Sequence, residues 1–197
     1  MSEKKLMIVL NGPSAVGKSA LMEHLATRDS RLFRKLRSVT TRERRSREDD
    51  SPYSSGPEYR FVSRKEFDGL IAAERIVQTG EFRGERYGLE LWYTKLQLGS
   101  KHGVIALTKS GVDLLATIPD LAPRVRVVAV CADLSVIRDN MRHHGHGADE
   151  IENEMPVVTA HIGPFRVHAM VTNLGRPDSV WRMAESLKHQ LEIKDED

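Results

Sequence analysis

The segment from residue 12 to residue 19 constrains the fold of this chain more than any other. It reads Gly-Pro-Ser-Ala-Val-Gly-Lys-Ser and matches the phosphate-binding pattern G-x-x-x-x-G-K-[ST] without a gap. A strand-like run over 5–10 precedes it, and a helical stretch over about 18–27 follows it. In such a loop the backbone N–H groups surround phosphate oxygens, and the N-terminus of the next helix adds positive potential. The motif in this context predicts a binding site for a nucleoside triphosphate.

The residues of this loop have separate expected roles. We expect Lys18 to reach the β- and γ-phosphates and to be catalytic, and the Ser19 hydroxyl to bind Mg²⁺. The other predicted contacts to the triphosphate are Gly12, Ser14, Ala15, Val16 and Gly17.

The composition excludes several classes of protein. The chain has 197 residues, of which 40% are hydrophobic and 29% charged, as expected for one folded domain rather than a disordered or membrane protein. A net charge of +2 predicts no nucleic-acid partner. The apolar run over 6–10 is too short to cross a membrane, and no signal peptide is indicated. Cys131 is the only cysteine, so no internal disulfide can form, which suits a cytoplasmic location.

Apolar and periodic segments alternate along the rest of the chain. Nearly continuous apolar runs over 103–107, 125–130 and 167–172 predict strands of a sheet that is covered on both faces. Helical spacing of apolar residues appears over 134–141 and 180–191. This alternation predicts an α/β fold with a parallel sheet flanked by helices.

Two segments interrupt the alternation. Residues 38–93 contain a polar loop, two strand-like pieces and a short helix, which a capping box of Ser63 and Glu66 predicts to begin after Ser63. This pattern predicts an inserted subdomain. The irregular stretch over 142–149 predicts a lid or hinge loop. We therefore expect a single domain over 1–197, with a core over 1–37 and 94–197, a lid at about 142–155 and an inserted subdomain over 38–93.

A second phosphate-binding segment follows the first by about one helix length. In Ser38-Val39-Thr40-Thr41-Arg42-Glu43-Arg44-Arg45, two arginines three residues apart lie among hydroxyls and predict a clamp for another phosphate group. Together with Glu58-Tyr59-Arg60-Phe61-Val62-Ser63 and Arg86-Tyr87-Gly88, these motifs make the chain from residue 6 to about 187 resemble the guanylate kinase family. The resemblance implies a P-loop NTPase core with an inserted monophosphate-binding subdomain and a lid, ATP as phosphoryl donor and Mg²⁺ as cofactor.

The resemblance also implies which residues contact the substrates. The phosphate of the acceptor would be held by Ser38, Arg42, Arg45, Tyr59 and Tyr87. Asn173 matches a position near the adenine of ATP, and Arg142 matches a lid arginine. The resemblance therefore adds Arg42 and Arg142 to Lys18 as expected catalytic residues.

The chain departs from the family where the guanine base is read. An acidic residue, a hydroxyl and a strand-end carboxylate of the family are replaced by Gln78, Leu89 and Thr108. A carboxylate accepts two hydrogen bonds from guanine, whereas an amide offers one acceptor and a donor group. We keep Gln78 and Thr108 as expected acceptor contacts and leave the identity of the base open.

Charge also changes at the metal and lid positions. Ala106 and Thr108 stand where the family strand ends in two carboxylates, while His146 and Glu154 stand where it has lid arginines. An acid at the lid would oppose the charge of a transferring phosphoryl group unless it points away.

The leading hypothesis is a Mg-ATP-dependent kinase of a nucleoside monophosphate, such as GMP, dGMP or a modified relative. One alternative is a kinase of the same fold that acts on a sugar phosphate such as ribose 1,5-bisphosphate. Another is a catalytically weak, guanylate-kinase-like binding module. The partner is expected to be a small molecule, and the protein a monomer or homodimer.

Overall fold

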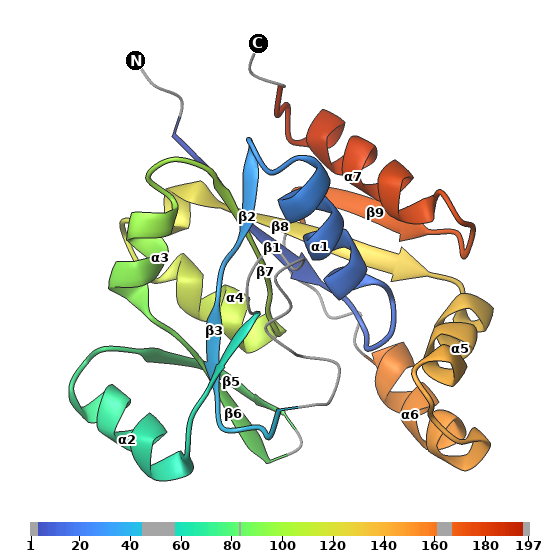
Figure 1. Cartoon of the computed structure of the whole chain (residues 1–197), viewed down its shortest axis with the longest axis horizontal. Coiled ribbons are helices and arrows are strands. Elements are labelled where there is room, and N and C mark those ends of the chain that lie inside the picture. The colour runs from blue at the N-terminus through green and yellow to red at the C-terminus, as the bar shows by residue number, and fades with distance from the viewer. Residues whose placement is uncertain (1–3, 45–57, 83, 161–166, 195–197) are drawn as a thin grey trace.

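Two β-sheets organise the computed structural model, which describes residues 4–44, 58–82, 84–160 and 167–194 (Figure 1). All neighbouring strands of the larger sheet are parallel. In spatial order they are β2 (Phe33–Lys35), β7 (His102–Ala106), β1 (Met7–Asn11), β8 (Val125–Ala132) and β9 (Ala169–Asn173). This confirms the predicted α/β fold with a parallel central sheet.

Strand β1 is buried on both faces because its residues alternate between two cores. Ile8 and Leu10 belong to the core beneath α1 (Lys18–Arg28) and α7 (Ser179–Gln190), whereas Met7 and Val9 belong to the core beneath α4 (Lys109–Ala116). All four side chains have no exposed surface. Such two-sided burial explains why the strand reads as a continuous apolar run. The short helices α3 (Leu91–Gln97) and η1 (Ala122–Arg124) complete the connections on the second face.

The smaller sheet forms within the predicted insertion. Its strand order is β4 (Tyr59–Phe61), β3 (Ser38–Thr40), β6 (Glu85–Leu89) and β5 (Val77–Phe82), and α2 (Arg64–Ala72) packs on it. The predicted capping box at the start of α2 is confirmed, because the Ser63 hydroxyl accepts from the Glu66 N–H and the Glu66 carboxylate accepts from the Ser63 N–H. A small core around Phe67 holds the helix against the sheet.

The predicted lid loop over 142–149 is wrong in part, because helices occupy both of its ends. Helix α5 (Leu134–His143) takes in Arg142, and α6 (Ala148–Ala160) begins near the end of the stretch. Gly145 turns the chain between them at a φ of 85°, a value that glycine adopts without strain. The acidic residues in the first turn of α6 complement its positive end. The two helices form a hairpin that projects from the core (Figure 1).

Helices across the described ranges lack the combination of length and hydrophobicity that crossing a membrane requires.

Glu90 joins the two sheets where the chain leaves β6. Its side chain is 4% exposed, and its carboxylate accepts from the Arg60 guanidinium of β4 at 2.7 Å. The guanidinium of Arg37, which immediately precedes β3, lies 3.7 Å from the other carboxylate oxygen and stacks on Tyr93. One buried carboxylate therefore fixes both the point where the chain enters the smaller sheet and the point where it leaves it.

Replacing Glu90 by glutamine tests this link. The variant leaves Arg37 and Arg60 without their counter-charge, so we expect the free energy of unfolding in urea to fall by about 1–2 kcal/mol, since both arginines are partly solvated. The matched control is Asp113→Asn, which breaks the exposed pair with Lys109 and should change the free energy by less than about 0.5 kcal/mol. Equal effects of the two variants would contradict a joining role for Glu90.

Candidate active site

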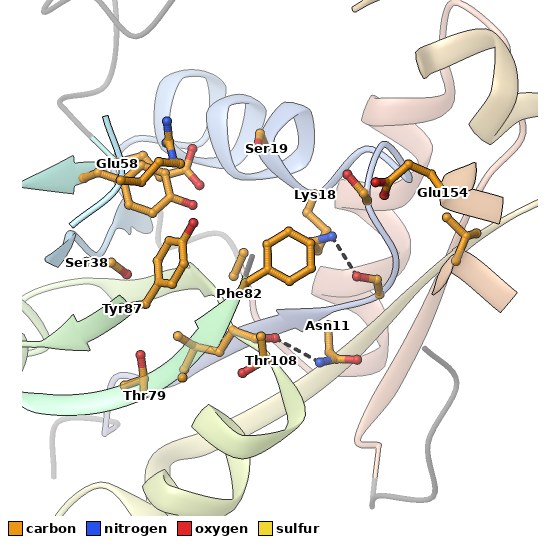
Figure 2. A pocket seen from close by; sticks show the side chains of 18 residues that line it. Asn11, Lys18, Ser19, Ser38, Glu58, Thr79, Phe82, Tyr87, Thr108 and Glu154 are labelled. Carbon is orange, nitrogen blue, oxygen red and sulfur yellow. Dashed lines mark hydrogen bonds between the residues drawn. The ribbon is translucent and has the colours of Figure 1, made fainter. Parts of the chain in front are cut away.

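One pocket opens at the carboxyl ends of β1 and β7 and reaches across to the smaller sheet. Asn11 and Ala106, the last residues of these strands, line the pocket. Ser38 lines it on the side of the smaller sheet (Figure 2). Parallel α/β sheets place ligands at this edge. Among the predicted site residues, those that line the pocket are Gly12, Ser14, Lys18, Ser19, Ser38, Arg42, Tyr59, Tyr87 and Thr108.

The phosphate-binding loop packs tightly against the sheet. Gly12 has a φ of 154°, and a Cβ atom there would lie 2.4 Å from the carbonyl oxygen of Val130 in β8. Gly17, the N-cap residue just before α1, has a φ of 108°. Both positions therefore require glycine, because a side chain would clash or strain the backbone. The loop residues of the sequence motif are determined by this close approach as much as by phosphate binding.

The side-chain amides of Asn173, which is buried, and Asn140, which is half-buried, hold the loop. The Asn173 side chain, at the end of β9, donates to the Val16 carbonyl at 3.1 Å, and its oxygen accepts from the Gly175 N–H at 3.0 Å. Asn140 of α5 donates to the Ala15 carbonyl at 2.8 Å. Asn173 is absent from the described lining of the pocket. In this structure it supports the loop backbone, and its contact with ATP stays a prediction. Sequence reasoning missed Asn140.

Lys18 is the first residue of α1, and its ammonium group reaches back to the start of the loop. Its ammonium donates to the carbonyls of Gly12 and Pro13 at 2.7 and 2.6 Å. An ammonium has three donors, so one remains for an oxygen in the pocket. Burial lowers the pKa of Lys18 to about 8, and the negative charge of Glu58 opposes that shift. The lysine is thus poised to gain or lose its charge near neutral pH.

Strand register brings together three residues that the sequence predicts to contact the acceptor phosphate, namely Ser38, Tyr59 and Tyr87. Ser38 pairs with Tyr59 on β4, and Thr40 pairs with Tyr87 on β6. Alternate residues of a strand share a face, so these side chains converge on one side of the smaller sheet. The Tyr59 and Tyr87 rings meet edge to face, with 6.1 Å between centroids, and the Arg42 guanidinium stacks 5.1 Å above Tyr59.

Tyr59 stays a neutral hydroxyl over the whole physiological range. Burial and the adjacent carboxylate of Glu58 raise the pKa of Tyr59 far above its ordinary value, and Arg42 offsets only part of this shift. The protonated phenol has one donor, and in this structure it forms a hydrogen bond with the Glu58 carboxylate. Tyr59 could therefore donate to an anion in the pocket only by exchanging this partner. Ser38, buried at 4% exposure, adds a second hydroxyl beside it.

Several other predicted residues lie elsewhere. Arg142 is exposed on α5 and pairs with Asp139 at 2.6 Å, away from the described pocket lining, so its catalytic role stays a prediction. Leu89 has no exposed surface and packs in the core, and it is not in the described lining of the pocket. Gln78 lies in β5, but its side chain is outside the described residues, as is the whole of Arg45.

Glu154 of α6 lines the pocket on the side of the phosphate-binding loop (Figure 2). The family resemblance placed Glu154 at the position of a lid arginine. The hairpin of α5 and α6 brings the Glu154 side chain to the wall of the pocket. The described lining therefore contains two carboxylates, Glu58 and Glu154, and two cationic side chains, Lys18 and Arg42.

A closed metal cage is absent from the part of the chain that the structure describes, where no three His, Cys, Asp or Glu residues gather. Ser19, which is exposed at the start of α1, offers a hydroxyl oxygen to the pocket. Mg²⁺ commonly keeps several waters and binds substrate phosphates with few protein ligands, so this sparse set of donors fits Mg²⁺ bound together with a nucleotide.

Comparison with known proteins places these features in context. The family model described as guanylate kinase matches residues 4–189. A guanylate kinase of Enterococcus faecalis is 33% identical over 155 residues, which cover 72% of this chain and 74% of that relative. A guanylate kinase of Lactobacillus delbrueckii subsp. bulgaricus is 31% identical over 156 residues, which cover 77% and 71%. The crystal structure of a guanylate kinase from Anaplasma phagocytophilum shares the fold, with a TM-score of 0.62 and 19% identity over 98% of this chain and 87% of that one.

The lowered pKa of Lys18 predicts a pH-dependent affinity for ATP. As the pH rises through about 8, Lys18 loses its proton in the free protein, and a neutral amine attracts phosphate less strongly. We expect the Kd of Mg-ATP, measured by calorimetry, to rise between pH 7.5 and 9.5 by up to about tenfold per unit. In Lys18→Met the dependence should disappear. A constant Kd in the unaltered protein would show that Lys18 stays charged.

The carboxylate of Glu154 predicts a gain of affinity on its removal. Replacing Glu154 by glutamine takes a negative charge from the pocket wall, so the Kd of Mg-ATP should fall by about two- to fivefold at low salt. The control is Glu150→Gln on the same helix, where the exposed carboxylate pairs with His146 and should leave the Kd unchanged. A rise in Kd for Glu154→Gln would mean that this carboxylate helps to hold the nucleotide-bound cation.

Proposed function

The chain belongs to the guanylate kinase family of ATP-dependent nucleoside monophosphate kinases, and we propose that it transfers the γ-phosphoryl group of ATP to a purine nucleoside monophosphate, with GMP as the first candidate. The observation that carries this proposal is that Lys18 of the phosphate-binding loop and the Arg42–Tyr59–Tyr87 cluster line the same pocket. Two anion-binding groups in one pocket can hold a donor and an acceptor end to end.

ATP would bind at the loop over 12–19. Its phosphates would meet the loop N–H groups, the positive end of α1 and the free donor of Lys18. Ser19 would contact the Mg²⁺ that accompanies ATP, and the metal would supply charge neutralisation between the β- and γ-phosphates. Asn140 and Asn173 would keep the loop carbonyls turned away from the phosphates.

The acceptor phosphate would bind on the smaller sheet. Arg42 would supply positive charge, and the hydroxyls of Ser38 and Tyr87 would donate hydrogen bonds. Tyr59 would also donate to the phosphate, in exchange for its hydrogen bond with Glu58. An oxygen of the acceptor phosphate would attack the γ-phosphorus of ATP, and the bond from that phosphorus to the bridging oxygen would break to release ADP. Because this oxygen is already ionised at neutral pH, no general base is required. Positioning and electrostatics account for the chemistry.

A sugar phosphate such as ribose 1,5-bisphosphate remains the second candidate for the acceptor. The observation that favours it is that Leu89 is buried and Thr108 is uncharged, so these two positions offer no charged reader for a base. A protein that binds ATP without transferring phosphate is the third reading. We further propose a cytoplasmic location, and a monomeric or homodimeric state stays a prediction.

The proposal is tested by measuring ADP release from Mg-ATP with GMP, dGMP, IMP, AMP, CMP, UMP, dTMP and ribose 1,5-bisphosphate. We expect turnover with a purine nucleotide. Arg42→Ala should raise the KM of the acceptor by about 10- to 100-fold because it removes a charge-assisted contact, and Lys18→Ala should lower kcat by more than about 100-fold.

The matched control is Arg44→Ala, two residues from Arg42. Arg44 stacks on Phe61 but is not in the described lining of the pocket, so its loss should leave the KM within about twofold. Turnover that survives Lys18→Ala would contradict the proposed donor site. Turnover with the sugar phosphate alone would favour the second candidate.

A further inference from the structure

A β-bulge singles out Thr79 in the strand that borders the pocket. In the antiparallel pair of β5 and β6, Gln78 lies opposite Gly88, but Gly80 lies opposite Tyr87, so Thr79 is an extra residue without a cross-strand partner. Bulges redirect side chains and occur often beside active sites. Here the bulge brings Thr79 into the lining of the pocket.

The hydroxyl of Thr79 is buried but makes no hydrogen bond in the described structure. Thr79 is 3% exposed, and its Oγ1 atom has no partner. The contact from Ser110 reaches the backbone carbonyl of Thr79, not this hydroxyl. A buried polar atom without a partner costs about 1–3 kcal/mol. Such an atom in a pocket wall points to a ligand that completes it.

The surroundings of Thr79 are neutral and rich in hydroxyls. Thr108 Oγ1 lies 2.9 Å from Ser110 Oγ, and a Cβ atom at Gly80 would lie 2.9 Å from the same Thr108 oxygen. The absence of a side chain at Gly80 therefore leaves Thr108 uncovered. Glu58 lies on the other side of Tyr87 from Thr79 (Figure 2). Since Lys18 and Arg42 serve the phosphates, this neutral end is left for the uncharged part of the acceptor.

We propose that Thr79 determines acceptor specificity by hydrogen-bonding the polar edge of a purine base, with Thr108 beside it. This inference rests on the proposed function and states which residues recognise the base of its acceptor. A hydroxyl both donates and accepts, whereas a carboxylate only accepts and so demands N–H groups. Reading by hydroxyls therefore does not require the 2-amino group of guanine. GMP and IMP should bind within about fivefold of each other.

The test is calorimetric binding of GMP and of IMP to the full chain and to two variants. Thr79→Val keeps the shape of the side chain but removes the hydroxyl, and Thr79→Ser keeps the hydroxyl. We expect Thr79→Val to raise both Kd values by about five- to tenfold, and Thr79→Ser to stay within about twofold of the unaltered protein. Because the valine variant removes an unpaired buried hydroxyl, its thermal midpoint should be unchanged or higher.

Thr94→Val is the matched control, since Thr94 is also buried but lies outside the described pocket lining. Its Kd values should be unchanged. The proposal is overturned if Thr79→Val binds both nucleotides normally, if its weaker binding comes with a lower midpoint, or if GMP binds more than about tenfold tighter than IMP. Absence of nucleotide binding to the unaltered protein also overturns it. Binding without ADP release would instead contradict the proposed kinase activity and leave the reading by Thr79 standing.

Discussion

The close contact between the phosphate-binding loop and the parallel sheet determines where the other parts of the site can lie. Gly12 approaches the Val130 carbonyl so closely that no Cβ atom fits. The amides of Asn140 and Asn173 bind the outward carbonyls of the loop. With these carbonyls held, the loop N–H groups are left to face an anion. The loop is thus braced by α5 and β9, elements more than a hundred residues away along the chain.

The second requirement is that the smaller sheet stays in a defined place opposite this loop. Its own register gathers Ser38, Tyr59 and Tyr87 on one face, but their distance from the loop is determined by how the sheet is joined to the core. Glu90 pairs with Arg37 and Arg60 at the two crossings of the chain. A buried carboxylate that pairs with two arginines holds both of them in place, because the loss of either partner leaves its buried charge less well compensated.

Charge is distributed unevenly along the pocket. Lys18 and Arg42 stand where phosphates are expected, and Glu58 and Glu154 limit the positive potential around them. Burial lowers the pKa of Lys18 while Glu58 raises it, so the affinity for an anion depends on the balance of the two effects. At the other end, Thr79 and Thr108 offer hydroxyls without charge. Under the proposed function, the pocket would recognise phosphate by charge at one end and the rest of the acceptor by hydrogen bonds at the other.

The loop over 12–19, the apolar strands, the capping box of α2 and the family could all be predicted from the order of residues, because each depends on residues close together in the chain or on a fixed spacing. The other features depend on contacts between distant parts of the chain. Helix α6 and Glu154 reach the pocket only through the hairpin with α5. Asn173 turned out to hold the loop because β9 ends behind it. Thr79, which has no motif, enters the pocket through a one-residue bulge in β5. Such a bulge depends on pairing between two strands, and no local pattern of residues encodes it.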